Sequence, residues 1–354
     1  MSRAPGARGV SAVPPETPEP LAARVYAALA DGRFRSGAEL ARQLGVTRSA
    51  VWKAARALRA LGVSVHAVRN RGYRLPEVAA PLDADRIRGA LSATVRERVR
   101  GIETVWCLPS TNAVLLERPD RSLYRADVLL AEYQSAGRGR RGRTWLAPPG
   151  GAICLSLSWC FAQLPRDLGA LGLAVGVCAL RALQPRVAAP LRLKWPNDLV
   201  VEIEGSHAAE ARKLAGILIE LRAEASGPTF VVIGIGVNIV LGKALLDEIA
   251  ATGTRATDLK SLGVAATERN TIVAALLEAI VPGLLAFEHD GLQPFSDEWV
   301  RADALRGSAV TVHSLDERTH GVARGIDASG ALLIETPQGL QRFVSGDVTV
   351  RAQR

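Results

Sequence analysis

The segment GRGRRGR at residues 137–143 carries the most unusual chemistry in the sequence, because four arginines are interspersed with three glycines. It formally matches the dinucleotide-binding pattern GxGxxG, but that loop must open directly into a helix. Residues 144–151, TWLAPPGG, cannot begin a helix, and the sequence has no phosphate-loop motif. The guanidinium groups predict a loop that repels itself and stays open when empty, then closes over a phosphate-bearing ligand. A basic surface loop for nucleic acid is the evenly matched alternative.

Four shorter motifs could complete a ligand site. Ser-Thr-Asn at 110–112 offers hydroxyl and amide groups to a neutral polar ligand such as a urea, and a plain helix N-cap explains it equally well. Residues 194–198, KWPND, end a predicted strand at a sharp turn, and Lys213 precedes an apolar run. Residues 234–238, GIGVN, hold a glycine pair that a ligand could approach closely. Since the sequence has no nucleophile or paired-carboxylate pattern, we expect catalysis by positioning and charge stabilisation.

The elements that must position these residues divide the chain into several parts. A length of 354 residues allows two or three domains, and 48% hydrophobic with 22% charged residues is typical of globular proteins. The N-terminus lacks the apolar segment of a signal peptide, and we expect a cytoplasmic protein without a membrane span. The four cysteines show no metal-ligand spacing, which predicts reduced thiols and no metal site.

The positive charge is concentrated near the N-terminus. Residues 1–80 carry 13 Arg and Lys against 5 Asp and Glu, which leaves 31 against 30 for the rest of the chain. This asymmetry predicts a basic N-terminal module that binds a polyanion. Residues 1–19 are rich in proline and are expected to form a disordered tail.

The pattern over residues 20–78 predicts a winged helix-turn-helix domain. A helix over 21–30 is followed by a helix that begins at the capping box Ser36 to Glu39, a turn at Gly45, and a second helix that Thr47 caps and that runs to about residue 61. Strands over 63–68 and 72–75 form the wing. Val51, Ala55 and Leu58 should face the core, and Arg74 joins the basic wing. The candidate DNA contacts are Ser36, Thr47, Arg48, Ser49, Trp52, Arg56, Arg69 and Arg71. The alternative is a small helical interaction domain whose arginines are merely solvated.

Residues 82–303 show mixed helix and strand signals and predict a central α/β domain, so that the fold class is multidomain α/β (α+β). Its predicted strands cover 128–132, 153–159, 191–194, 214–221 and 229–235, and its predicted helices cover 168–183 and 271–288. Residues 304–354 predict a small SH3-like β-barrel with strands at 309–313, 319–326, 331–335, 341–344 and 348–351.

Together these motifs resemble the biotin–protein ligases. The strings that carry the resemblance are STN at 110–112, EYQSAGRGRRGR at 132–143, KWPND at 194–198, KLAGIL at 213–218 and GIGVN at 234–238. With a winged helix before them and RGID and GALL at 324–327 and 330–333 behind them, the chain is similar to the bifunctional (class II) bacterial members of the family, which also repress the biotin operon. The resemblance covers nearly everything from about residue 20 onward.

The resemblance implies a biotin ligase domain of the biotin/lipoate ligase type and a two-step reaction. Biotin and ATP, with Mg²⁺ as a co-substrate, form biotinyl-5′-adenylate, and a lysine of the biotin carboxyl carrier protein of acetyl-CoA carboxylase then receives the biotinyl group. Catalysis is implied for Lys213, Arg138 and Arg140. Biotin binding is implied for Ser110, Thr111, Asn112, Gln134, Arg138, Gly139, Arg140, Lys213 and Gly216. Nucleotide binding is implied for Arg140, Arg141, Trp145, Asn197, Asp198, Lys213, Asn238 and Arg324.

The implied partners are the carrier protein, biotin operon DNA and a second copy of the chain, with the adenylate as corepressor. In the family the adenylate orders the arginine loop and favours a homodimer, which can span a two-fold operator. Two alternatives are a ligase whose winged helix does not repress, and a ligand-sensing repressor without catalysis. A lipoate ligase is not expected to carry KWPND beside this basic loop. The departures from the family are the tail, the insertion at 204–211 and Trp52, whose large ring changes which bases could be read.

Overall fold

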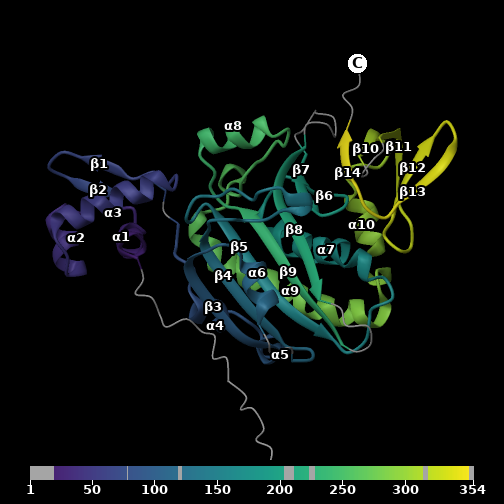
Figure 1. Ribbon diagram of the computed structural model, residues 1–354, viewed down its shortest axis with the longest axis horizontal. Helices are drawn as coiled ribbons and strands as arrows, with labels where there is room; N and C mark the ends of the chain where they lie inside the picture. The colour runs from purple at the N-terminus through teal and green to yellow at the C-terminus, as the bar shows by residue number, and fades with distance from the viewer. Residues whose placement is uncertain are drawn as a thin grey trace, which may run out of the picture.

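The computed structural model describes residues 20–77, 79–118, 122–202, 211–222, 228–313 and 318–350. The predicted tail and most of the 204–211 insertion lie outside these ranges. Figure 1 shows three parts in chain order: a small helical module in purple, a large central sheet with its helices, and a small sheet in yellow.

The N-terminal module has the predicted order of three helices and a hairpin. Its elements are α1 (Leu21–Leu29), α2 (Gly37–Leu44), α3 (Arg48–Ala60), β1 (His66–Val68) and β2 (Gly72–Arg74). Both predicted N-caps are confirmed: the Ser36 hydroxyl accepts from the Glu39 amide at 3.0 Å, and the Thr47 hydroxyl accepts from the Ala50 amide at 3.2 Å. A capping box also predicts that the Glu39 side chain bonds back to the Ser36 amide. That prediction is wrong, because the Glu39 carboxylate pairs with Arg35 instead.

The wing strands are shorter than predicted. Residues 63–65 read as the start of a strand, but their backbone is bound to the end of α3 instead. The Val63 amide donates to the Leu58 carbonyl, and the Arg59 guanidinium donates to the Val65 carbonyl at 2.7 Å and 2.9 Å. Because these groups are already satisfied, strand pairing begins only at His66.

The faces of α3 match the prediction. Val51, Ala55 and Leu58 are buried, and they form part of the module's hydrophobic core. Arg48, Ser49, Trp52 and Arg56 are exposed on the opposite side. The helical spacing of apolar residues was therefore sufficient to orient this helix.

The central part is built on a seven-stranded sheet with the order β3-β4-β5-β9-β8-β7-β6. The strands are β3 (Val99–Leu108), β4 (Ala126–Gln134), β5 (Ala152–Phe161), β6 (Leu191–Lys194), β7 (Asp198–Val201), β8 (Arg212–Arg222) and β9 (Thr229–Asn238). The β3–β4 pair is parallel, and the other pairs are antiparallel. Sequence reasoning missed β3 and β7. The first is an edge strand with exposed Arg100 and Glu103, so it lacks a clear apolar alternation.

Helices cover both faces of this sheet. They are α4 (Ala84–Gly89), α5 (Ala93–Arg98), α6 (Thr111–Glu117), α7 (Leu171–Leu183), α8 (Lys243–Ala251), α9 (Arg269–Asp290) and α10 (Ser296–Ala302). The stretches 168–186 and 266–290 are long and apolar enough to cross a membrane by composition alone. Here α7 and α9 pack against each other, and their apolar side chains belong to the main hydrophobic core. Their hydropathy is therefore explained by burial in the core.

The C-terminal part contains the five strands predicted for it. They are β10 (Ala309–His313), β11 (Arg318–Ile326), β12 (Leu332–Thr336), β13 (Gly339–Phe343) and β14 (Asp347–Val350), in the antiparallel order β13-β12-β11-β10-β14. The sheet is tied to the central part where the Trp195 indole donates to the Gly330 carbonyl at 3.1 Å. Trp195 is buried and precedes a cis peptide bond to Pro196.

The helical module rests on the central part through an aromatic contact. The ring of Tyr26 in α1 lies 5.5 Å from the ring of Trp106 in β3. The Tyr26 hydroxyl also occupies the space that a side chain at Gly150 would need, since a Cβ there would lie 1.9 Å from it. Burial raises the pKa of the Tyr26 phenol far above its usual value. The module is therefore seated on the segment that follows the arginine loop.

A buried ion pair joins several elements beneath this contact. The Arg269 guanidinium lies 2.8 Å from the Glu132 carboxylate, and both side chains are almost completely buried. Arg269 also donates to the carbonyls of Ala80 and Ala152, while Glu132 accepts from the Leu82 amide at 2.6 Å. The pair therefore connects α9, the end of β4, the start of β5 and the segment that leaves the winged helix.

We predict that Glu132→Gln destabilises the protein by about 3 kcal/mol, because it leaves a buried guanidinium without its counter-charge. Urea unfolding followed by circular dichroism measures the loss. The control is Glu103→Gln, which breaks the solvent-exposed pair with Arg118 and should cost less than about 1 kcal/mol. Equal losses of unfolding free energy in the two variants would contradict the conclusion that the buried pair stabilises the protein more than the exposed pair does.

Candidate active site

A glycine trough crosses one face of the central sheet. Gly234 of β9 pairs with Ser156 of β5 on one side and with β8 on the other, and Gly236 pairs across β8 with Gly216. Because side chains alternate along a strand, one side of the sheet carries Gly234 and Gly236 together with their partners Ser156 and Gly216. Ile217 of β8 faces the other side, where α7 packs. The face that carries these glycines is therefore the one on which α6 and the residues after the arginine loop lie.

The polar end of the trough is built by the start of α6. The Asn112 side chain lies directly over Gly234, where an added Cβ would be only 2.4 Å from its oxygen. The Ser156 hydroxyl lies 2.6 Å from the Thr111 hydroxyl and 2.5 Å from the Asn112 oxygen. The side-chain oxygen Oε1 of Gln134 accepts from the backbone amide of Thr111 at 2.8 Å. The structure therefore brings together the residues implied for biotin binding at this end and adds Ser156, which sequence reasoning missed.

Two residues of this cluster also form hydrogen bonds to other groups of the protein. Ser110 is the N-cap of α6 and accepts from the Ala113 amide at 3.4 Å. The Asn112 amide donates to the Leu218 carbonyl and, at 2.8 Å, to the Glu220 carboxylate. Both amide hydrogens of Asn112 are thus used inside the protein, so this residue presents mainly its carbonyl oxygen to the trough.

Glu220 links the polar cluster to the arginine loop, and sequence reasoning also missed it. One carboxylate oxygen accepts from Asn112, and the other lies 3.3 Å from the Arg138 guanidinium. The only sequence signal was a charged residue that interrupts the apolar strand after KLAGIL. Its significance depends on β8 and the loop meeting in space.

The arginine loop is folded in this structure, and backbone hydrogen bonds join its two ends. The Gly139 amide donates to the Arg143 carbonyl at 2.7 Å, and the Trp145 amide donates to the Gly137 carbonyl at 2.9 Å. Arg141 adopts a left-handed conformation with φ of 55° between them. Mutual repulsion is offset by acidic groups, namely Glu220 at one end and Asp347 of β14 at the other.

Asp347 anchors the loop to the C-terminal sheet. Its carboxylate lies 2.6 Å from the Arg143 guanidinium and 3.5 Å from that of Arg141, and Arg141 also donates to the His313 carbonyl at 3.0 Å. Arg140 is half-buried, and burial lowers the pKa of its guanidinium. A desolvated cation of this kind is suited to an anionic ligand.

Trp145 and Lys213 occupy the far end of the trough. The Trp145 ring lies over Gly236 and Gly216, since a Cβ at Gly236 would come within 2.5 Å of it and one at Gly216 within 3.3 Å. The Lys213 ammonium lies 5.8 Å from the centre of that ring and 2.6 Å from the Asp198 carboxylate. Lys213, Asp198 and Trp145, three of the residues implied for nucleotide binding, therefore meet here.

Lys194 adds a further cation that sequence reasoning did not select. Burial lowers the pKa of its ammonium, and Asp198 partly opposes this effect. The charges of Lys213 and Arg143 also lower this pKa, and that of Asp347 raises it. Lys194 therefore belongs to the same charged cluster. Its position in KWPND was the available signal.

Three residues implied for nucleotide binding lie differently from what that role suggests. The Asn197 amide donates to the Ile217 carbonyl at 2.7 Å, and the Asn238 amide donates to the carbonyls of Lys213 and Thr257. These two asparagines hold the strands that present Lys213. Arg324 pairs with Glu335 on the C-terminal sheet, and no contact found in the described ranges joins it to the trough. The C-terminal groups that contact the loop are the Asp347 carboxylate and the His313 carbonyl. Within the same ranges, no group of three His, Cys, Asp or Glu side chains could hold a metal ion.

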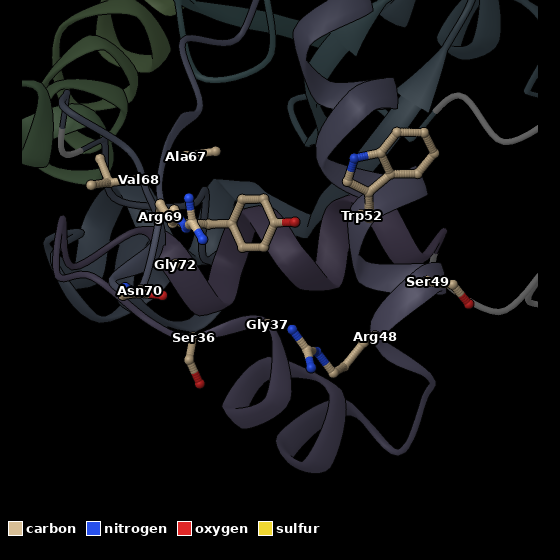
Figure 2. A pocket seen from close by; sticks show the side chains of 11 residues that line it. Ser36, Gly37, Arg48, Ser49, Trp52, Ala67, Val68, Arg69, Asn70 and Gly72 are labelled. Carbon is tan, nitrogen blue, oxygen red and sulfur yellow. The ribbon is translucent and has the colours of Figure 1, made fainter.

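A second candidate site lies on the N-terminal module. A hollow of about 650 Å³ separates α3 from the wing, and Figure 2 shows Arg48, Ser49 and Trp52 on the helix side with Arg69 and Asn70 on the wing side. Ser36 lies at its edge, and Thr47 caps α3 beside it. Arg71 is outside this lining and stacks on Phe34, with 4.2 Å between its guanidinium carbon and the ring centre.

Comparison with known protein families gives three matches in chain order. Residues 24–74 match the HTH domain, residues 105–238 match the biotin/lipoate A/B protein ligase family, and residues 307–351 match the biotin protein ligase C-terminal domain.

Individual relatives agree with these matches. The chain is 36% identical to the bifunctional ligase/repressor BirA of Salmonella typhimurium, over 92% of this chain and 95% of that protein. It is 34% identical to the biotin–[acetyl-CoA-carboxylase] ligase of Mycobacterium tuberculosis, over 75% of this chain and 98% of that protein. Among solved structures, the biotin protein ligase of Aquifex aeolicus in complex with biotin and ATP matches with a TM-score of 0.57 and 25% identity, over 72% of this chain and all of that one.

We predict that Gly236→Ala loosens the arginine loop, because the new methyl group would displace the Trp145 ring. Trypsin cleavage within residues 138–143, followed by mass spectrometry, should be about tenfold faster, as a shift of about 1.4 kcal/mol in local opening would produce. The control is Gly89→Ala in α4, where an added Cβ meets nothing within 4 Å. Unchanged cleavage in Gly236→Ala would show that Trp145 does not hold the loop.

Proposed function

The chain belongs to the biotin/lipoate A/B protein ligase family, and from that premise we propose that it is a bifunctional biotin–protein ligase and transcriptional repressor. It activates biotin with ATP and Mg²⁺ to biotinyl-5′-adenylate and transfers the biotinyl group to a lysine of the biotin carboxyl carrier protein of acetyl-CoA carboxylase. The domains proposed for these tasks are residues 20–78 for DNA binding, 82–303 for catalysis and 304–354 for the C-terminal barrel.

The observation that carries this proposal is the single trough with two different ends. One end offers neutral hydroxyl and amide groups, which suit the ureido head of biotin. The other end collects the cations Lys213, Lys194, Arg140 and Arg143, with Lys213 beside the Trp145 ring. A ligand that spans the two ends thus meets hydrogen-bonding groups at one end and phosphate-binding cations at the other.

In the first step, a carboxylate oxygen of biotin attacks the α-phosphorus of ATP. The bond to the bridging oxygen of the β-phosphate breaks, and pyrophosphate leaves. Both reactants are anionic, so the cations reduce their repulsion and stabilise the charge that develops on the phosphate oxygens. Lys213 supplies one of these cations, and its backbone carbonyl accepts from the side-chain amide of Asn238. Arg138 and Arg140 supply two more from the loop.

In the second step, the neutral amine of the carrier lysine attacks the acyl carbon of the mixed anhydride. AMP leaves, and the nitrogen loses a proton as the amide forms. Water would compete for the same acyl carbon, so the intermediate must be shielded until the carrier arrives. The Trp145 ring and the folded loop provide this cover over the trough.

The winged helix supplies the second activity. Exposed Arg48 and Arg56 on α3 and Arg69 on the wing present positive charge on both sides of the hollow. We propose that they bind biotin operon DNA, that the adenylate is the corepressor, and that the DNA-bound form is a homodimer. The proposal places both activities in the cytoplasm, where ATP, the carrier protein and DNA meet.

The ligase activity is tested with purified protein, ATP, Mg²⁺, biotin and a carrier-protein domain, with the carrier analysed by mass spectrometry. We expect the mass of the carrier to rise by one biotinyl group. Lys213→Ala should reduce the rate by about 100-fold or more, since it removes a cation that stabilises the developing charge. A carrier whose mass does not change with wild-type protein would refute the ligase function.

Arg140→Gly should weaken retention of the adenylate, because the loop would lose a half-buried cation beside the phosphate. Released adenylate then labels lysines of a bystander protein, which mass spectrometry detects. Arg166→Gly, which removes an exposed arginine outside the loop, is the matched control and should leave bystander labelling at the wild-type level. Bystander labelling by Arg140→Gly that equals the control would argue against the retention role of the loop.

The repressor function predicts DNA binding that depends on both salt and ligand. Affinity for the upstream region of the protein's own biotin operon should fall steeply with salt, and biotin with ATP should strengthen it. Arg69→Ala should lower the slope of log affinity against log salt by about 0.9, the value for one phosphate contact. Binding that is indifferent to biotin and ATP would leave only general DNA affinity.

A further inference from the structure

The outward face of α3 carries a stacked pair of side chains that a general phosphate-binding surface does not require. The indole of Trp52 is 48% exposed, although it is one of the largest apolar groups in the protein. The Arg56 guanidinium carbon lies 4.9 Å from the centre of this ring. The two residues are one helical turn apart, so they share one face of the helix.

The surroundings of this pair select the kind of partner that covers it. Trp52 lines the same hollow as Arg48 at the start of α3 and Arg69 on the wing, and Figure 2 shows these groups around one open space. A second copy of the chain would bring the same positive charge and be repelled. Charge complementarity therefore favours a polyanion that also offers an apolar contact, and duplex DNA meets both conditions in its major groove.

We propose that Trp52 and Arg56 act as one reading unit for a thymine and a neighbouring guanine in each operator half-site. Thymine is the base that presents an apolar 5-methyl group in the major groove, against which the indole packs. Guanine presents N7 and O6, to which the guanidinium donates two hydrogen bonds. This inference rests on the proposed repressor function and adds the bases that the repressor reads.

The stacking explains why the two residues work together. A guanidinium held against an aromatic face loses less side-chain freedom when it binds a base edge. In the described part of the chain, no carboxylate pairs with Arg56, and its side chain is exposed, so its donors are available to a partner. Four residues advance about 6 Å along a helix, which is one to two base-pair steps of DNA. The thymine and the guanine therefore lie within two base pairs of each other.

The test uses the full chain with biotin, ATP and Mg²⁺ and a duplex enriched from a randomised library. Deoxyuridine replaces each thymidine in turn, which deletes only the methyl group, and 7-deazaguanine replaces each guanine, which deletes N7. We expect one deoxyuridine position to weaken binding by about fivefold, the equivalent of one buried methyl group. One 7-deazaguanine position within two base pairs should weaken it by about tenfold.

The variants assign these effects to residues. Trp52→Ala, and Trp52→Gln as a second truncation, should lose sensitivity to the deoxyuridine substitution, and Arg56→Ala should lose sensitivity to 7-deazaguanine. Leu340→Ala, which removes another exposed apolar side chain but on the C-terminal sheet, should retain both sensitivities. Biotin transfer by every variant should stay at the wild-type level, which shows that the catalytic part of each variant folds.

The outcomes separate this inference from the proposed function. If no duplex is enriched, the repressor function fails, and the reading unit fails with it. If a duplex is enriched but wild type and both Trp52 variants respond equally to deoxyuridine, the repressor function stands and the reading unit is wrong. A thymine and guanine more than two base pairs apart would also overturn it.

Discussion

The buried pair between Glu132 and Arg269 is the interaction on which the remaining architecture depends. Two opposite charges have been removed from water, so each must be compensated by the other and by nearby backbone groups. The carbonyls of Ala80 and Ala152 and the amide of Leu82 supply those groups. A single charged centre thereby fixes where the winged-helix linker, two central strands and the long helix α9 meet.

This centre lies close to the site in both sequence and space. Glu132 stands two residues before Gln134, which bonds the start of α6, and the arginine loop follows directly. The loop returns to the sheet at Gly150 and Gly151, where Tyr26 of the winged helix is seated. Only a few residues therefore separate the ring that covers the trough, Trp145, from the surface that carries the DNA-binding module. The geometry provides a short physical connection between ligand binding and the orientation of that module.

Charge compensation explains how so basic a loop can fold beside two lysines. Glu220 and Asp347 lie at opposite ends of the loop and come from β8 and the C-terminal sheet. Glu220 is shared between Arg138 and Asn112, and Asp347 is shared between Arg141 and Arg143. The glycines of β9 complete the arrangement, because side chains at Gly234 or Gly236 would occupy the space of Asn112 or Trp145.

The sequence by itself determined the features that depend on neighbouring residues. The caps at Ser36 and Thr47, the buried face of α3, most central strands and the composition of the arginine loop follow from local hydrogen bonding and side-chain periodicity. The motifs also carried the family resemblance, since short strings of specific residues can be recognised without knowledge of the fold.

Only the tertiary structure decided which distant residues meet. Ser156, Glu220, Lys194 and Asp347 join the site because of sheet register and the docking of the C-terminal sheet, whereas Arg324 points to its own sheet. The loop is folded because its acidic partners lie about 80 and 200 residues further along the chain. Contacts at such separations depend on the packing of whole elements, and no local pattern encodes them.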